Sequence, residues 1–396
     1  MAIEKIKVGL IGSGTISWTY LQNMTELFGI LDVVGCSDIV PGRSAERAKE
    51  FGIKQMTNEE IYADSEIRIV VNTTYPGAHY EVNEKALLAG KHVHVEKMMT
   101  ATYEDAVKLY ELAKDNGLRL SCAPDTFLGA AYQTARKILD AGLIGKPVFA
   151  EGLVIRGYKA DFPGTIYRPK GMWGTGSTAP ADLGGYYLSA LVHLLGPIAR
   201  VAGFGQLHGV AYTNTKNPRY GEFIEAEENT SITASMEFVS GVLGSLTVSG
   251  DCFGETPRLE IYGTEGRIVC PDPNTYTGPL YLQRAGSNKL MEIPLSHDYN
   301  SYNKGECPDR KRSWPDPFWA ESRRGLGVTD LAWAITNDRP HRCSAELGLH
   351  AIEFIHGVEL SCKQNIIYQM KSRPAQSAPL PSGFLGGEAE KAFDTK

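Results

Sequence analysis

A glycine-rich segment near the start of the chain has the residue types and spacing that bind phosphate. Residues 12–17 read GSGTIS and lie between an apolar run and a helical pattern. The first glycine permits a tight turn, the second leaves room for a pyrophosphate, and the small last residue lets the helix pack on the strand. Backbone N–H groups at the helix start then form an anion site. Unless this is a plain glycine-rich turn, dinucleotide binding is predicted for Gly12, Ser13, Gly14, Thr15 and Ile16.

An acidic residue follows the second expected strand. Asp38 lies about twenty residues beyond the loop, where a carboxylate accepts hydrogen bonds from the adenosine ribose and repels a 2′-phosphate. The next residue is Ile39 rather than an arginine, although Arg43 is near in the sequence. The expected cofactor is therefore NAD, with NADP less favoured; the alternative for Asp38 is a solvated turn residue.

Glu96 and Lys97 follow another expected strand, and the carboxyl ends of parallel strands are where such sheets bind ligands. Near a positively charged nicotinamide ring the pKa of Lys97 should fall, which suits proton relay to a substrate hydroxyl. The alternative is an ordinary solvated lysine just past a strand.

A second cluster with usable chemistry lies at the start of a later helix. Asp182 and Tyr186 are four residues apart, so one helical face presents both. Gly184 and Gly185 lie between them and remove side-chain bulk, which would let a ligand approach. The alternative is that Asp182 complements the helix N-terminus and Tyr186 is a core aromatic.

The elements around these motifs alternate over the first 125 residues. Strands are expected at residues 5–11, 31–36, 67–72, 91–95 and 118–122, with helices at 17–28, 44–51, 79–89 and 102–116. Short connections between alternating strands and helices require parallel strands and right-handed crossovers. Residues 1–125 are therefore predicted to form an α/β Rossmann domain with a doubly wound parallel sheet.

The pattern changes after Pro147. Strands at residues 148–156, 231–238, 242–249, 258–262 and 267–270 are separated by turns, which predicts a largely antiparallel open sheet. Helices are expected at 127–141, 181–195, 318–336 and 345–362. Residues 126–371 are therefore predicted to form an α+β domain for substrate binding and oligomerisation. Residues 372–396, rich in Pro, Gly and Ser, should be an irregular tail.

The composition excludes several classes of protein. The chain has 396 residues, 42% of them hydrophobic, and a net charge of −6 with the charges interspersed, which suits two folded domains and argues against a nucleic-acid partner. No run of about 18 apolar residues predicts a membrane span, and the N-terminus does not resemble a signal peptide. Seven scattered cysteines without CxxC spacing indicate reduced thiols in the cytoplasm and no metal framework.

Taken together, these motifs resemble the Gfo/Idh/MocA family, named after glucose–fructose oxidoreductase, inositol dehydrogenase and a rhizopine catabolism protein. The resemblance runs from residues 12–17 to the RPHRCS segment at 339–344, and is most specific at GKHVHVEK (90–97), GLIG (142–145) and DLGGY (182–186). It implies a Rossmann domain and a second domain whose open sheet serves in a homodimer or homotetramer. It also implies oxidation or reduction of a hydroxyl on a sugar or cyclitol with NAD(P).

Two positions depart from the family pattern. Met98 follows Lys97 where the family has proline, and Tyr186 replaces the usual catalytic histidine. His193 lies two turns further along the helix and is not a substitute. Either Tyr186 takes the hydroxyl proton, activated by the Lys97 cation, or Lys97 is the base and Tyr186 orients the substrate. Asp182 is expected to accept a hydrogen bond from the substrate.

The resemblance also assigns supporting residues. The expected cofactor contacts beyond the loop are Thr73, Thr74, Pro76, His79, Glu96 and Lys97. The expected substrate contacts, besides the catalytic Lys97, Asp182 and Tyr186, are Arg156, Tyr158, Tyr167, Arg168 and Trp173.

The expected activity is NAD-dependent oxidation or reduction of a secondary hydroxyl on a sugar, cyclitol or glycoside, with C3 of a pyranose as one candidate carbon. One alternative is NAD-dependent, redox-assisted glycoside cleavage, and another is a non-catalytic NAD-responsive regulator. The sequence leaves open the substrate, the direction and whether NAD stays bound between turnovers.

Overall fold

The N-terminal part of the computed structural model is built on a parallel sheet. The structure describes residues 4–157, 173–298, 322–383 and 389–395. Six strands follow the order β3-β2-β1-β4-β5-β6, and every pair is parallel. Their bounds are β1 (Ile6–Ile11), β2 (Leu31–Ser37), β3 (Lys54–Gln55), β4 (Ile67–Asn72), β5 (His92–Val95) and β6 (Leu120–Cys122). The order reverses between β1 and β4, which is where such sheets hold their ligands.

Several helices of this part begin at a local sequence signal, either a proline or a capping residue. The helices are α1 (Thr15–Glu26), α2 (Pro41–Phe51), α3 (Asn58–Ala63), α4 (Pro76–Leu88) and α5 (Tyr103–Asp115). Helices α2 and α4 begin three residues earlier than predicted, because a proline occupies the first turn of each. Thr57 and Glu60 form a capping box at the start of α3, a short helix that the apolar pattern did not indicate. The predicted doubly wound sheet is confirmed.

The second sheet has nine strands in the order β16-β15-β14-β13-β7-β12-β11-β8-β17. Their bounds are β7 (Pro147–Arg156), β8 (Ile198–Gln206), β11 (Ser231–Phe238), β12 (Leu243–Ser249), β13 (Glu255–Gly263), β14 (Gly266–Cys270), β15 (Tyr281–Arg284), β16 (Met291–Glu292) and β17 (Tyr368–Gln369). The predicted antiparallel character is confirmed except at β7 and β12, which pair in parallel. Between β7 and β12 the chain passes through α7 (Ala179–Leu195), β8 and β11. Strand β12 therefore runs in the same direction as β7.

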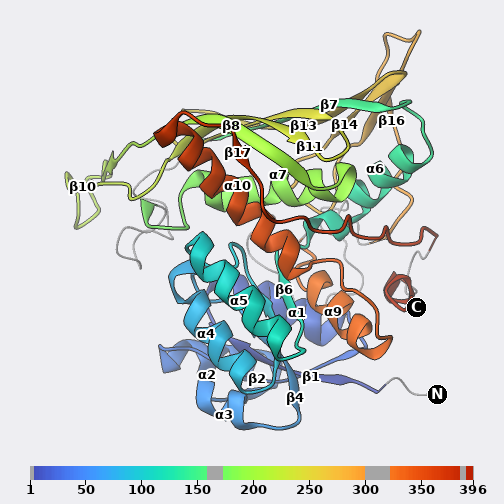
Figure 1. The fold of residues 1–396 in the computed structure, drawn as a ribbon. Helices are drawn as coiled ribbons and strands as arrows, with labels where there is room; N and C mark the ends of the chain where they lie inside the picture. The colour runs from blue at the N-terminus through green and yellow to red at the C-terminus, as the bar shows by residue number, and fades with distance from the viewer. Residues whose placement is uncertain (1–3, 158–172, 299–321, 384–388, 396) are drawn as a thin grey trace.

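Within the described residues, three helices of this part lie on the side of the nine-stranded sheet that faces the Rossmann domain (Figure 1): α6 (Ala130–Asp140), α7 and α10 (Ala345–Gln364). Helix α9 (Leu326–Thr336) instead contacts β5 and β6 of the Rossmann sheet. Helix α10 packs on β8 and also on α5, so it joins the two parts. The helix predicted at 127–141 is broken at Gly129, where a Cβ would lie 2.4 Å from the Tyr276 carbonyl oxygen; a 3-10 turn (Thr126–Leu128) precedes α6 instead.

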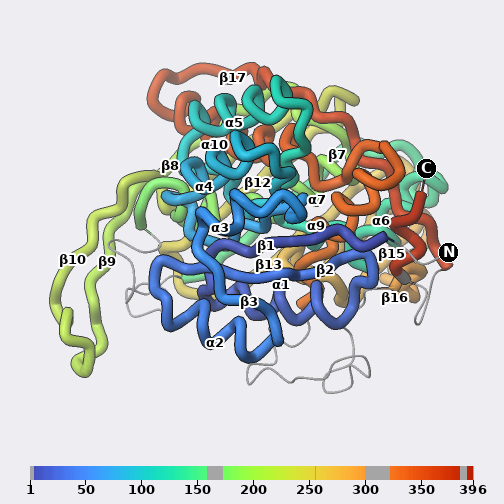
Figure 2. Tube along the Cα trace, turned by 90° about the horizontal axis from the view of Figure 1, so that it is seen from below, coloured from blue at the N-terminus to red at the C-terminus, as the bar shows by residue number. Residues whose placement is uncertain are grey.

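A short hairpin of β9 (Val210–Ala211) and β10 (Phe223–Ile224) projects from the body of the molecule (Figures 1 and 2). The sequence pattern did not indicate it. Within the described ranges, no helix combines the length and the apolar character needed to cross a bilayer.

The predicted C-terminal tail carries little regular structure but is firmly docked. The Glu390 carboxylate accepts hydrogen bonds from the backbone N–H groups of Gly29 at 2.8 Å and Ile30 at 2.9 Å. Phe393 is fully buried. The segment after β17 therefore returns to the Rossmann domain and links the two parts.

Candidate active site

The phosphate loop at the end of β1 has the geometry that its glycines predict. Gly12 has φ +100°, and a Cβ there would lie 2.7 Å from the backbone of Thr73 and Thr74. The Thr73 hydroxyl donates a hydrogen bond to the Gly12 carbonyl at 2.6 Å. A Cβ on Gly14 would meet no atom within 4 Å, and no side chain caps α1 at this residue. The loop therefore leaves an open space at the N–H groups that begin α1, and a pyrophosphate fits there.

Asp38 lies directly beside this loop. One carboxylate oxygen accepts a hydrogen bond from the Ser13 backbone N–H and the other from the Val40 N–H, both at 2.8 Å. A carboxylate has about four acceptor positions, so Asp38 keeps capacity for ribose hydroxyls. The loop and Asp38 together fit the pyrophosphate and the ribose of a dinucleotide.

The next loop, after β4, is held by polar contacts to the backbone. Thr74 donates through its N–H and its hydroxyl to the Asn72 side-chain oxygen, and Pro76 begins α4. The two ring nitrogens of His79 lie 2.7 Å from the Met98 carbonyl oxygen and 3.2 Å from that of Thr74. His79 is fully buried, and this burial lowers its pKa. It joins the loops after β4 and β5, and the cofactor contact expected for it stays a prediction.

Lys97 and Asp182 form an ion pair across the two parts of the chain. The Lys97 ammonium contacts the Asp182 carboxylate and also donates to its backbone carbonyl at 3.0 Å. Burial by itself lowers the pKa of Lys97, but Asp182, Tyr186 and Glu96 together raise it above its ordinary value. The protein groups thus oppose the expected fall in the pKa of Lys97, and they keep the side chain an ammonium ion.

Tyr186 lies one helical turn beyond Asp182 on α7. The Lys97 ammonium nitrogen is 5.2 Å from the centre of its ring. A Cβ on Gly185 would lie 3.1 Å from the Met98 sulfur, and one on Gly184 would lie 3.5 Å from Ile355. Gly185 therefore lets the Met98 side chain approach α7 closely, and the ligand approach expected at these glycines stays a prediction.

The sequence reasoning missed a buried arginine in this cluster. The Arg324 guanidinium donates to the Tyr186 hydroxyl oxygen at 3.0 Å, to the Asn274 side-chain oxygen at 3.1 Å and to the Ser322 hydroxyl at 2.8 Å. Arg324 is 5% exposed. The helix predicted at 318–336 placed Arg323 and Arg324 inside it, whereas α9 begins only at Leu326, so both arginines precede the helix. The pair of consecutive arginines was the available signal.

Glu96 provides the negative charge between the two cations. Its carboxylate accepts hydrogen bonds from the Tyr20 hydroxyl at 2.8 Å and from the Lys97 backbone N–H at 3.1 Å, and it lies 3.9 Å from Arg324. These contacts are within the protein and Glu96 is buried. It therefore balances charge in the cluster, and the cofactor contact expected for it stays a prediction.

Two family models match the chain. "Oxidoreductase family, NAD-binding Rossmann fold" matches residues 6–123, and "GFO/IDH/MocA C-terminal domain" matches residues 132–269. The chain belongs to the Gfo/Idh/MocA family. It is an NAD(P)-dependent oxidoreductase, and the resemblance drawn from its motifs is confirmed.

Curated and solved relatives agree with this family. The chain is 27% identical over 268 residues to scyllo-inositol 2-dehydrogenase (NAD(+)) of Bacillus subtilis (strain 168), covering 67% of this chain and 73% of that protein. It is 30% identical over 202 residues to scyllo-inositol 2-dehydrogenase (NADP(+)) IolW of the same strain, covering 49% of this chain and 53% of that one. A structure of levoglucosan dehydrogenase matches with a TM-score of 0.77 at 19% identity, covering 94% of this chain and all of that one. This structural likeness shows the shared fold.

The predicted substrate residues of this family member divide into three groups. Arg156, at the end of β7, lies 3.6 Å from Asp272, in the same loop as Asn274 and thus near Arg324. Trp173 is buried in a separate small cluster with Tyr212, Ile224 and Ala226 at the β9–β10 hairpin, so the structure does not bring it to Lys97. Tyr158, Tyr167 and Arg168 lie outside the described residues.

His193 has a structural role. Its ring nitrogens lie 3.1 Å from the Gln133 amide nitrogen and 2.8 Å from the Ser377 hydroxyl, and burial lowers its pKa to about 3. It ties α7 to α6 and to the C-terminal segment, and it does not replace the family's histidine.

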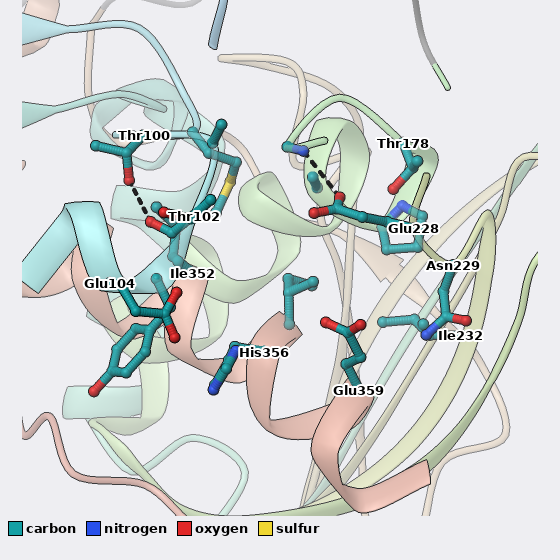
Figure 3. Close-up of a pocket in the computed structure, with 17 residues that line it drawn as sticks. Thr100, Thr102, Glu104, Thr178, Glu228, Asn229, Ile232, Ile352, His356 and Glu359 are labelled. Carbon is teal, nitrogen blue, oxygen red and sulfur yellow. Dashed lines mark hydrogen bonds between the residues drawn. The ribbon is translucent and has the colours of Figure 1, made fainter. Parts of the chain in front are cut away.

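A cavity of about 150 Å³ is lined by Met98, the residue after Lys97, and by residues of α5, α7 and α10 (Figure 3). Its lining includes Glu104, Glu228 and Glu359 but neither Lys97 nor Tyr186. Burial, with the nearby Glu359 and Glu227, raises the pKa of Glu228 to about 7, although its hydrogen bond from the Gly176 N–H opposes this. Among the described residues, no group of three or more His, Cys, Asp or Glu side chains could hold a metal ion.

Proposed function

We propose that this protein is an NAD-dependent dehydrogenase that acts on a secondary hydroxyl, or the matching ketone, of a polyhydroxylated ring. The observation that carries the proposal is the Lys97–Asp182 ion pair beside the buried hydroxyl of Tyr186. A cation, a carboxylate and a phenol together can bind a hydroxyl and its neighbour and can move one proton. The relatives named for inositol and levoglucosan support a cyclitol or sugar as the substrate class.

The preference for NAD rests on Asp38. The carboxylate lies beside the loop that would hold the pyrophosphate, and its charge disfavours a 2′-phosphate. Gly12, Gly14 and the start of α1 would hold the pyrophosphate. When bound, NAD supplies the acceptor for the hydride that leaves the carbon.

Side chains of the protein carry out the remaining steps. Lys97, held as an ammonium by Asp182, donates a hydrogen bond to the reacting oxygen and stabilises negative charge on it. Asp182 accepts a hydrogen bond from a neighbouring hydroxyl and orients the ring. Tyr186 moves the proton: its ionised oxygen takes the hydroxyl proton in oxidation, and its O–H returns a proton to the carbonyl oxygen in reduction.

A substrate panel tests this proposal. Purified protein is incubated with NAD or NADP and with inositols, anhydrosugars, free sugars and glycosides, while NADH absorbance and product mass are recorded. We expect NADH formation together with a product lighter by two hydrogens. Aglycone release without net redox change would favour glycoside cleavage, and NAD binding without any turnover would favour a regulator.

We also propose a homo-oligomer, a dimer or tetramer, formed through the outer face of the nine-stranded sheet. Support comes from exposed apolar side chains on three of its strands: Phe149 (β7), Phe204 (β8) and Leu243 (β12), of which Phe204 is 78% exposed. Large exposed apolar patches mark association sites. Light scattering of wild type and Phe204→Glu tests this, and a monomeric wild type would refute it.

A further inference from the structure

Arg324 is fixed in place from two sides of the molecule. The Asn23 side chain, on α1, donates to the backbone carbonyls of Ser322 at 3.1 Å and Arg324 at 2.8 Å. The Gly325 N–H donates to the buried carboxylate of Asp125 at 2.9 Å. The turn that carries Arg324 is therefore held to the Rossmann domain, and the guanidinium reaches the Tyr186 hydroxyl on α7 from a constrained backbone.

The hydrogen bond between Arg324 and Tyr186 can have only one donor. A guanidinium is a donor only and keeps its protons, so the Tyr186 oxygen must be the acceptor. The proton of the phenol is then left for another partner. The titratable groups around the pair are Lys97 over the ring with its partner Asp182, Glu96 beside the guanidinium, and Tyr20, Tyr276 and Asp125.

We propose that Arg324 is a positioning residue for proton transfer, which stabilises the negative charge on the Tyr186 oxygen whenever that oxygen lacks its proton. The proposal rests on the proposed function and specifies how Tyr186 works in it. In oxidation the substrate O–H bond breaks and a Tyr186 O–H bond forms, while the C–H electron pair leaves with the hydride. In reduction the same bonds change in reverse, and Arg324 keeps all its protons in both directions.

This assignment explains why a tyrosine can occupy the position of the family's histidine. A neutral imidazole accepts a proton without becoming an anion, whereas a phenol must first lose its own proton. A fixed cation on the phenol oxygen favours that ionised form. Lys97, whose charge is paired with Asp182, lies over the ring, whereas Arg324 donates directly to the hydroxyl oxygen.

The kinetic test compares Arg324→Met and Arg324→Lys with wild type on a substrate from the panel. We expect Arg324→Met to lower kcat by roughly 10- to 100-fold, the size of one hydrogen bond to a charged group. The acidic limb of its kcat–pH profile should move to higher pH. Arg324→Lys keeps the charge and should restore part of both. An unchanged profile in Arg324→Met would overturn the proposal.

A double-mutant cycle separates this role from a purely structural one. If Arg324 acts through Tyr186, adding Arg324→Met to Tyr186→Phe should cost less than about threefold more in kcat, because coupled residues are not additive. Effects that multiply would overturn the proposal. Arg136→Met is the matched control: this half-buried arginine binds Asp140 and the His193 carbonyl, and its loss should leave the pH profile unchanged.

A spectroscopic titration does not depend on turnover. Phenolate absorbance is recorded against pH for wild type, Tyr186→Phe and Arg324→Met. The step missing from Tyr186→Phe belongs to Tyr186, and it should move to higher pH in Arg324→Met. A step that stays in place would overturn the role of Arg324 even in an active enzyme. A step that moves would uphold it even if no polyol on the panel reacts, which would then count against the proposed function alone.

Discussion

The phosphate loop and the cluster around Tyr186 both follow the carboxyl ends of Rossmann strands, but they use different parts of the chain. The loop is six consecutive residues whose backbone forms the site, with Gly12 at φ +100° and open space at Gly14. The cluster consists of side chains from the loop after β5, from α7 and from the turn before α9, and it depends on charges that balance one another. Backbone geometry should therefore decide cofactor binding, and charge placement should decide turnover.

The largest effect is expected at Gly12. Gly12→Ala places a methyl group 2.7 Å from the Thr73 backbone at a positive φ, so the free energy of unfolding should fall by about 2–4 kcal/mol and NADH binding should be lost. Gly14→Ala is the matched variant, because its methyl group meets no protein atom. It should keep full stability but bind NADH about tenfold more weakly or worse. Thermal unfolding and titration calorimetry measure both. Equal stability of the two variants would contradict the role assigned to Gly12.

Lys97→Met tests the other half of the comparison. The variant should still bind NADH but lose about a thousandfold in kcat, because the ammonium that stabilises the reacting oxygen is gone. Lys85→Met, which removes an exposed lysine paired with Glu81 on α4, is the control and should leave kcat unchanged. Cofactor fluorescence and steady-state rates separate the two properties. Lost cofactor binding in Lys97→Met would show that the loop and the cluster are not independent.

A smaller effect on cofactor use is expected at Asp38, because its carboxylate adds a side-chain charge to a cofactor site formed mainly by backbone groups of the phosphate loop. Asp38→Asn should lower kcat/KM with NAD by roughly tenfold. The ratio of kcat/KM with NAD to kcat/KM with NADP should fall as well. Asp32→Asn, on the exposed side of the same strand, should change neither value. An unchanged ratio of the two kcat/KM values in Asp38→Asn would remove Asp38 from the basis for cofactor choice.

The smallest effect concerns Glu228, whose carboxylate lies near Glu359 and Glu227, which carry the same charge, whereas the Lys97 ammonium is paired with carboxylates of opposite charge. The pKa of Glu228 is raised from 4.5 to about 7, so its contribution to stability is complete below pH 4.5 and is lost as pH rises through 7. Glu228→Gln can still accept from the Gly176 N–H. Its free energy of unfolding should exceed that of wild type by about 1–2 kcal/mol at pH 8 and match it near pH 4.5. Glu225→Gln, an exposed neighbour, should match wild type at both values in denaturant unfolding; a pH-independent difference for Glu228→Gln would contradict the assignment.

The sequence by itself determined the features that local physics controls. Positive φ and close packing at residue 12 need glycine, and the alternation of apolar runs with helical patterns in the first 125 residues needs a parallel sheet. The four-residue spacing of Asp182 and Tyr186 put both on one helix face. Strands as short as β3 and β17, with two residues each, leave no such periodic signal and were not predicted.

Only the tertiary structure decided which charges meet. Lys97 and Asp182 are 85 residues apart, and Tyr186 and Arg324 are 138 apart. Contacts at such separations leave no trace in local spacing, because they depend on how α7 and the turn before α9 pack against the Rossmann domain. The same packing brings Asp182 and Glu96 to Lys97, where they raise its pKa and so oppose the fall expected beside a nicotinamide ring. It also places Trp173 in a separate buried cluster with Tyr212.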